Sequence, residues 1–97
     1  MIKLIKVRGA SMAPTLASGD YLICTKARAL RPGFVVVANH PKYGVIVKRV
    51  KSAVDNIVRL EGDNPESTDS DALGDLPRGL ISHRAGWAVT PKGVKRL

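Results

Sequence analysis

Phe34-Val35-Val36-Val37-Ala38 is apolar at every position and follows the turn pair Pro32-Gly33. A strand with one solvated face alternates apolar and polar residues, whereas a strand buried on both faces is apolar throughout. We therefore expect this segment to be a strand that is covered on both sides.

Other short runs with β-strand character lie on either side of it, separated by turn residues. They are residues 2–7, 21–25, 45–54, 57–60 and 81–90. Asp55-Asn56 fits a two-residue hairpin turn, and residues 77–80 fit a single helical turn. No segment has a long helical period. We expect an all-β fold with one or two short helical turns, either a small bent sheet or a partly open barrel, forming one domain over residues 1–97.

The composition is that of an ordinary globular protein, with 97 residues of which 44% are hydrophobic and 25% are charged. A chain of this length buries about 65% of the surface that it exposes when unfolded, which allows one modest core. Cys24 is the only cysteine, so no internal disulfide can form, and we expect a small buried thiol. No apolar run approaches the roughly 20 residues that span a bilayer. We expect no transmembrane anchor and a cytoplasmic location.

The formal net charge of +8 is unevenly distributed, because residues 1–54 carry ten Lys and Arg but only one acid, Asp20. Such a basic half favours attraction to nucleic acid, an anionic membrane surface or an acidic protein, or else it is a solvated surface. Four aromatic residues are few for stacking on bases; they are Tyr21, Phe34, Tyr43 and Trp87. A non-enzymatic basic β module that binds nucleic acid or an acidic partner is the alternative to an enzymatic function.

Two segments combine into a possible catalytic pair: Ser11-Met12-Ala13-Pro14-Thr15-Leu16, closing with Gly19-Asp20, and Lys48-Arg49 within an apolar run. A serine hydroxyl is a poor nucleophile until a base removes its proton. A lysine can do this only as a neutral amine, and burial lowers its pKa by disfavouring the charged form. Side chains alternate across a strand, so Lys48 is expected to share a face with Ile46 and Val50, away from Arg49.

The residues around Ser11 suit a nucleophile held in a turn. Gly9 allows an unusual backbone conformation and close approach of a substrate, and Pro14 fixes the turn that follows. Met12 can fill apolar space beside the nucleophile, and Met12 and Pro14 are expected to contact substrate. The backbone N–H of Ser11 is the first candidate for stabilising an oxyanion. Taken singly, such a serine is more often part of a surface turn, and such a lysine more often reaches the solvent.

The third block, Gly62-Asp63-Asn64-Pro65-Glu66-Ser67-Thr68-Asp69-Ser70, lies in a polar loop. In this order the three blocks resemble the type I signal peptidases over roughly residues 5–90. The resemblance implies that Ser11 is the nucleophile and Lys48 the general base. It also implies that Ser67 orients the lysine, that Asp69 braces the loop, and that a peptide leader of a precursor protein is the substrate.

Three departures from that family are visible. Asp71 follows Ser70 where the family usually has arginine, so Asp69 is expected to lack its usual ionic partner. Gly9 stands where Gram-negative members carry an oxyanion-donating serine. With no anchor expected, the chain resembles the short, soluble maturation proteases of nickel superoxide dismutase in its length, in Gly62-Asp63-Asn64-Pro65 and in Ser67-Thr68-Asp69-Ser70. This resemblance implies the precursor of that enzyme as the substrate.

A second resemblance is to the self-cleaving LexA-type repressors, which share the serine–lysine pair and a Gly-x-Ser-Met…Gly-Asp opening. The spacing from Ser11 to Lys48 suits this group. Pro-Thr-Leu after Ser-Met and the Gly-Asp-Asn block favour the signal-peptidase side. No Ala-Gly or Cys-Gly pair lies upstream of Ser11, so self-cleavage of that kind is not expected.

No metal site or cofactor is expected, because one cysteine and two histidines show no metal-ligand spacing. His40 is expected at the surface in a turn, and His83 in a structural role on the last strand. Trp87 is expected as a core or edge anchor. Residues 92–97 are expected to form a solvated tail.

Overall fold

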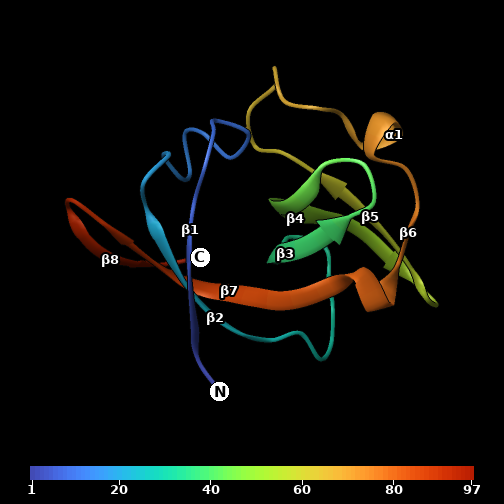
Figure 1. Cartoon of the computed structure of the whole chain (residues 1–97), viewed down its shortest axis with the longest axis horizontal. Helices are drawn as coiled ribbons and strands as arrows, with labels where there is room; N and C mark the ends of the chain where they lie inside the picture. The colour runs from blue at the N-terminus through green and yellow to red at the C-terminus, as the bar shows by residue number, and fades with distance from the viewer.

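A computed structural model describes residues 1–97 and consists almost entirely of β-strands (Figure 1). Eight strands form an antiparallel sheet in the order β1-β2-β7-β3-β4-β5-β6, with β8 beside β7, and the sheet is not closed into a barrel. The strands are β1 Lys3–Lys6, β2 Tyr21–Lys26, β3 Val35–His40, β4 Gly44–Val54, β5 Ile57–Glu61, β6 Leu76–Pro77, β7 Ile81–Thr90 and β8 Gly93–Arg96. The predicted all-β fold is confirmed.

Strand β7 joins the two halves of the sheet, and Figure 1 shows it running across the molecule. One edge of β7 pairs with β2, from Tyr21 opposite Val89 to Lys26 opposite His83. Its other edge pairs first with β3 and then with β8. The register shifts once against β2 and once against β3. Such bulges bend a strand, so one strand serves both halves.

The core lies on both faces of β3, as its apolar run predicted. Val35 and Val37 belong to one buried cluster, together with Met12 and Cys24. Val36 belongs to a second cluster, whose other members include Val50, Leu60 and Leu73. Burial raises the pKa of the Cys24 thiol to about 11, so this cysteine is the buried core thiol that was expected.

The segment 92–97 is not the solvated tail that was expected. Residues 93–96 form β8, which pairs with the end of β7. The Leu97 N–H donates to the Gly86 carbonyl, and the Lys95 ammonium donates to the Thr15 carbonyl. β8 is exposed along its whole length. It is held by backbone pairing, which does not require the apolar pattern by which a buried strand is recognised in the sequence.

The polar loop contains a helix, α1 Ser70–Leu73, that the sequence analysis did not predict. The Asp69 carboxylate caps its first turn, and Gly74 ends it with a φ of +78°. The helical turn predicted at residues 77–80 is the 3₁₀ helix Arg78–Leu80. His40, expected at the surface, is only 8% exposed, because α1 packs beside it. Trp87 is 45% exposed at the β7–β8 pairing and is not a core residue.

Candidate active site

A groove lies between the edge strand β1 and the first half of β4. β1 pairs only with β2, and residues 44–48 of β4 pair only with β3, since β5 joins β4 from Arg49 onward. The groove has a volume of about 440 Å³. Side chains from β1 and the segment after it, from the β3–β4 turn and β4, and from α1 line it. Ser11 and Lys48 both lie in this lining.

Lys48 is 4% exposed in the middle of β4, opposite Val36 of β3. It has no ion-pair partner, and its burial lowers the pKa of its amine. Alternation along the strand places Arg49 on the opposite face, where it contacts Asp63. Desolvation without a compensating carboxylate favours the neutral amine, which is the form that can accept a proton.

Ser11 is half-buried in the turn that connects β1 to β2. Two backbone hydrogen bonds close this connection, from the Val7 N–H to the Asp20 carbonyl and from the Gly19 N–H to the Val7 carbonyl, both 2.8 Å. Gly9 has a φ of +78°, the left-handed conformation for which glycine was expected there. The Ser11 N–H has no acceptor within the protein. No hydrogen bond joins the Ser11 hydroxyl to the Lys48 amine, so that contact stays a prediction.

The Gly-Asp-Asn block docks onto the Ser11 turn through Asp63. Its carboxylate accepts two hydrogen bonds from the Arg49 guanidinium, each 2.7 Å, and one from the Thr15 hydroxyl, 2.5 Å. The hydrogen bond from Arg49 is the main reason why the pKa of Asp63 is lowered. Thr15 thus bonds a carboxylate that lies 48 positions away in the sequence. Asp63 therefore links the strand that carries Lys48, through Arg49, to the turn that carries Ser11, through Thr15.

Asn64 makes the second connection to the same turn. Its N–H donates to the Ser11 carbonyl, 3.0 Å, and its side-chain amide donates to the Ala10 carbonyl, 2.9 Å. Asn64, Asp63 and Arg49 were not among the predicted site residues. Their signal was present in the sequence, since the Gly-Asp-Asn block and the Lys-Arg pair were both noted, but their contacts depend on the tertiary structure.

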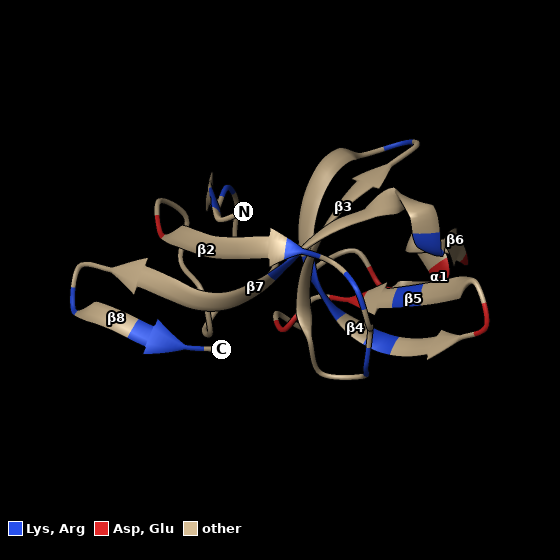
Figure 2. Ribbon diagram, turned by 90° about the horizontal axis from the view of Figure 1, so that it is seen from below, with Lys and Arg blue, Asp and Glu red and all other residues tan.

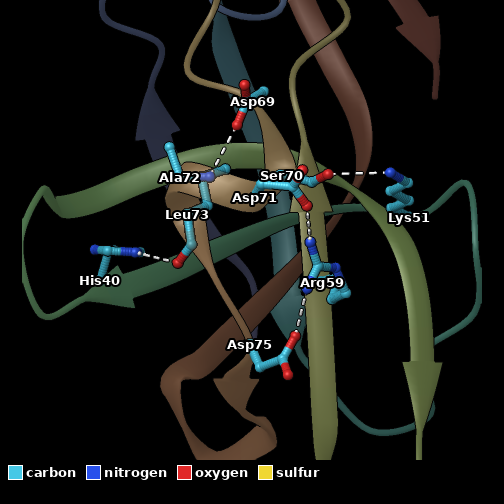
Figure 3. A network of polar contacts seen from close by, with 9 residues as sticks. All are labelled: His40, Lys51, Arg59, Asp69, Ser70, Asp71, Ala72, Leu73 and Asp75. Atoms are coloured by element: carbon cyan, nitrogen blue, oxygen red, sulfur yellow. Dashed lines mark hydrogen bonds and ion pairs between the residues drawn. The ribbon is translucent and has the colours of Figure 1, made fainter.

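Gly62 and Ser67 pack tightly beside the Ser11 carbonyl. A Cβ atom on Gly62 would lie 2.2 Å from the Ser67 hydroxyl and 2.5 Å from the Ser11 carbonyl oxygen. Ser67 itself donates its N–H to the Asn64 carbonyl, 2.9 Å. It makes no hydrogen bond to Lys48 and lines a separate hollow, so its orienting role stays a prediction. Asp69 caps α1 and forms no ion pair (Figure 3).

The two residues expected to contact substrate do not line the groove. Met12 is 1% exposed and belongs to the core cluster. Its side chain fills apolar space beneath the Ser11 turn, as expected, and is therefore unavailable to a substrate. Pro14 is exposed on the outside of that turn. Groove contacts come instead from residues such as Ile5, Val45 and Ile46.

No group of three or more His, Cys, Asp or Glu side chains is placed to hold a metal ion. No helix of the protein combines the length and the apolar character needed to cross a bilayer. Among the side chains that line the groove, Ser11 supplies a hydroxyl and Lys48 a buried amine.

A family model described as Peptidase S24-like matches residues 2–75 of the chain. The matched segment contains Ser11, Lys48 and the Gly-Asp-Asn block. This finding supports a serine-peptidase type of function and points to the S24/LexA-like group, which is the second of the two resemblances described above. No curated protein and no solved structure matches the chain.

Replacing Gly62 with alanine is expected to displace Ser67 and the Ser11 carbonyl, because the new Cβ has no room. Overpacking of this kind should lower the free energy of unfolding by about 1–3 kcal/mol. Gly79→Ala is the matched control, since a Cβ there meets nothing within 4 Å and the backbone is not left-handed. Urea denaturation of both variants measures the effect, and equal stabilities would contradict the packing described.

The Asp63–Arg49 pair should make stability depend on acid pH. The pKa of Asp63 is lowered in the folded protein, so its contribution is present above the unfolded value of about 3.9 and is lost as pH falls through the folded value. Asp63→Asn should lower the free energy of unfolding at pH 7 by about 1–3 kcal/mol. The difference from the wild type should shrink below pH 4. A difference that is constant from pH 7 to pH 2 would exclude this account.

Proposed function

Because the chain belongs to the Peptidase S24-like family, we propose that it is a serine endopeptidase with Ser11 as nucleophile and Lys48 as general base. The observation that carries the proposal is the placement of a buried lysine with a lowered pKa in the same groove as Ser11. An exposed lysine would be protonated near neutral pH and could not serve as a base.

In the proposed reaction, the neutral Lys48 amine takes the proton of the Ser11 hydroxyl as its oxygen attacks the carbonyl carbon of the scissile bond. The unoccupied Ser11 N–H donates to the oxyanion. The resulting Lys48 ammonium then gives its proton to the departing amine, leaving an acyl-enzyme. The same amine, neutral again, takes a proton from water, which hydrolyses the ester and restores Ser11.

The substrate is proposed to bind as an extended peptide. The free edges of β1 and of residues 44–48 of β4 carry unpaired backbone groups, and a peptide can add to such edges through main-chain hydrogen bonds. We propose that this peptide is the N-terminal leader of a precursor protein, with small residues at the cleavage site of Ala-x-Ala type. The precursor of nickel superoxide dismutase is the specific substrate that the first resemblance implies.

The contacts of Asp63 and Asn64 support this reading, because they fix the serine's turn relative to the lysine's strand. Lys48 faces the groove while Arg49, next to it, holds Asp63. Asn64 then holds the carbonyls of Ala10 and Ser11. Catalysis by a positioned base requires such preorganisation. Ser67, beside Gly62, is proposed to complete the support of Lys48 when substrate closes the groove.

The decisive experiment replaces Ser11 by alanine and Lys48 by methionine. Both variants should lose cleavage of a leader peptide with an Ala-x-Ala site. Wild-type activity should rise with pH as the Lys48 amine loses its proton, and should level off below the ordinary lysine value of about 10.4. Cleavage by folded Ser11→Ala protein at the wild-type rate would refute the proposal.

Lys48→Met also separates a catalytic role from a structural one. A buried lysine with a lowered pKa destabilises the folded protein, most of all below its folded value, and this cost fades as pH rises towards the unfolded value. The methionine variant should therefore be more stable than the wild type at pH 7 in urea denaturation while being inactive.

A basic binding module is the second candidate, and one observation favours it. Lys26, Arg28, Arg31 and Arg84 line a hollow of about 410 Å³ that contains no acidic residue. None of the four forms an ion pair, and the Arg84 guanidinium lies 3.5 Å over the Phe34 ring. Figure 2 shows basic positions at the adjoining ends of β2 and β7.

The two candidates make different predictions for Arg84→Gln. If the hollow binds a polyanion, a short DNA or RNA strand or a polyglutamate peptide should bind at low salt, weaken steeply with added salt and bind less tightly to this variant. Leader cleavage should be unaffected, because Arg84 does not line the groove. Fluorescence anisotropy measures the binding, and its absence at low salt would remove this candidate.

A further inference from the structure

His40, at the end of β3, makes three hydrogen bonds through its buried ring. Nδ1 lies 3.0 Å from the Lys42 nitrogen and 3.3 Å from the Tyr43 nitrogen, and both are backbone N–H donors. Nε2 lies 2.9 Å from the Leu73 carbonyl oxygen, which can only accept. The three partners therefore require a neutral ring with its proton on Nε2.

The partners of His40 belong to two different parts of the groove lining. Tyr43 lies in the turn between β3 and β4, and Leu73 is the last residue of α1; both side chains line the groove. The Tyr43 ring also packs against the imidazole, with centroids 4.9 Å apart. The His40 side chain thus connects the turn that follows it to the helix, whose residue Leu73 lies 33 positions further along the chain.

The helix α1 depends on such contacts, because four residues make too few internal hydrogen bonds to be stable alone. On one side, Arg59 holds Asp71 and Asp75 at 2.6 and 2.7 Å, and Lys51 holds Ser70 at 3.0 Å. Figure 3 shows His40 on the other side of the helix, directed at the Leu73 carbonyl. The contact between His40 and Leu73 is the one drawn in Figure 3 that joins α1 to β3, the strand that leads into the turn carrying Tyr43.

We propose that His40 is a positioning residue for substrate binding, which fixes Tyr43 and Leu73 relative to each other and so shapes their end of the groove. It acts through these two residues and does not touch Ser11 or Lys48. This inference rests on the proposed peptidase function, and it adds a determinant of peptide affinity that lies outside the serine–lysine pair.

Three substitutions separate the two connections. His40→Asn keeps an acceptor near the position of Nδ1 and loses the bond to Leu73. His40→Gln keeps a donor near the position of Nε2 and loses the bonds to the turn. His40→Leu loses both. His83→Asn is the matched control, because His83 is a partly buried histidine whose Nδ1 contacts the neighbouring Ser82 hydroxyl, and it does not line the groove.

The measurements are KM and kcat for a leader peptide with an Ala-x-Ala site, on variants shown to be folded by circular dichroism. His40→Asn and His40→Gln should each raise KM by roughly three- to tenfold, the factor expected for a lost buried hydrogen bond. His40→Leu should raise it further, with kcat within about twofold of the wild type in all three. His83→Asn should leave both constants unchanged.

Unchanged KM in the folded His40 variants would overturn the inference, as would a fall in kcat alone. A purely structural role would lower stability without changing KM of the folded protein. Nitrogen NMR of the wild-type imidazole gives an independent check that needs no variant, since a proton on Nδ1 would contradict the geometry.

Failure of the proposed function is distinguishable from failure of this inference. If the wild-type protein cleaves no peptide, the peptidase proposal fails, while the amide NMR signals of Tyr43 and Leu73 still report on His40. His40→Asn should then shift the signals of Leu73 and Gly74, and His83→Asn should not. No shift in α1 would overturn the coupling.

Discussion

The burial of a lysine in the middle of β4 is the constraint on which the arrangement of this protein depends. Lys48 is 4% exposed and has no carboxylate to compensate its charge. Strand alternation places Arg49 on the opposite face, where its fixed charge meets Asp63. Two adjacent basic residues thus lie in different environments. Burial favours the neutral amine of Lys48, whereas the Arg49 guanidinium stays charged beside Asp63.

Other contacts hold the turn that carries Ser11 in place relative to β4. Asp63 and Asn64 connect the face that carries Arg49 to the turn that carries Ser11. Gly62 permits the close approach, because its missing side chain leaves room for Ser67 and the Ser11 carbonyl. The long strand β7 supports both halves of the sheet, so the two edges that border the groove belong to one hydrogen-bonded framework.

Polar groups hold the segments that lack a large apolar face. The helix α1 and the loop before it are fixed by Arg59, Lys51, His40 and Asp69. Hydrogen bonds of this kind are directional, and each buried partner is costly to leave unpaired. The groove wall at Leu73 therefore has a defined position although α1 is only one turn long.

Local patterns in the sequence determined six of the eight strands, all but β6 and β8, together with the coverage of β3 on both faces and the opposite orientation of Lys48 and Arg49. These features follow from the side-chain period of a strand, which neighbouring residues encode by themselves. The three motifs also indicated the class of chemistry. They marked Ser11 and Lys48, which both line the groove, and Gly9, whose φ is positive as expected.

Only the tertiary structure decided which residues meet. The contacts of Asp63 with Thr15, of His40 with Leu73 and of β8 with β7 join segments whose proximity depends on strand order and register. Met12 was expected to contact substrate, but its side chain belongs to the buried core cluster beside Cys24 and Val35. Sequence periodicity fixes the direction of a side chain relative to its own strand, and it contains no information about which distant segment lies opposite.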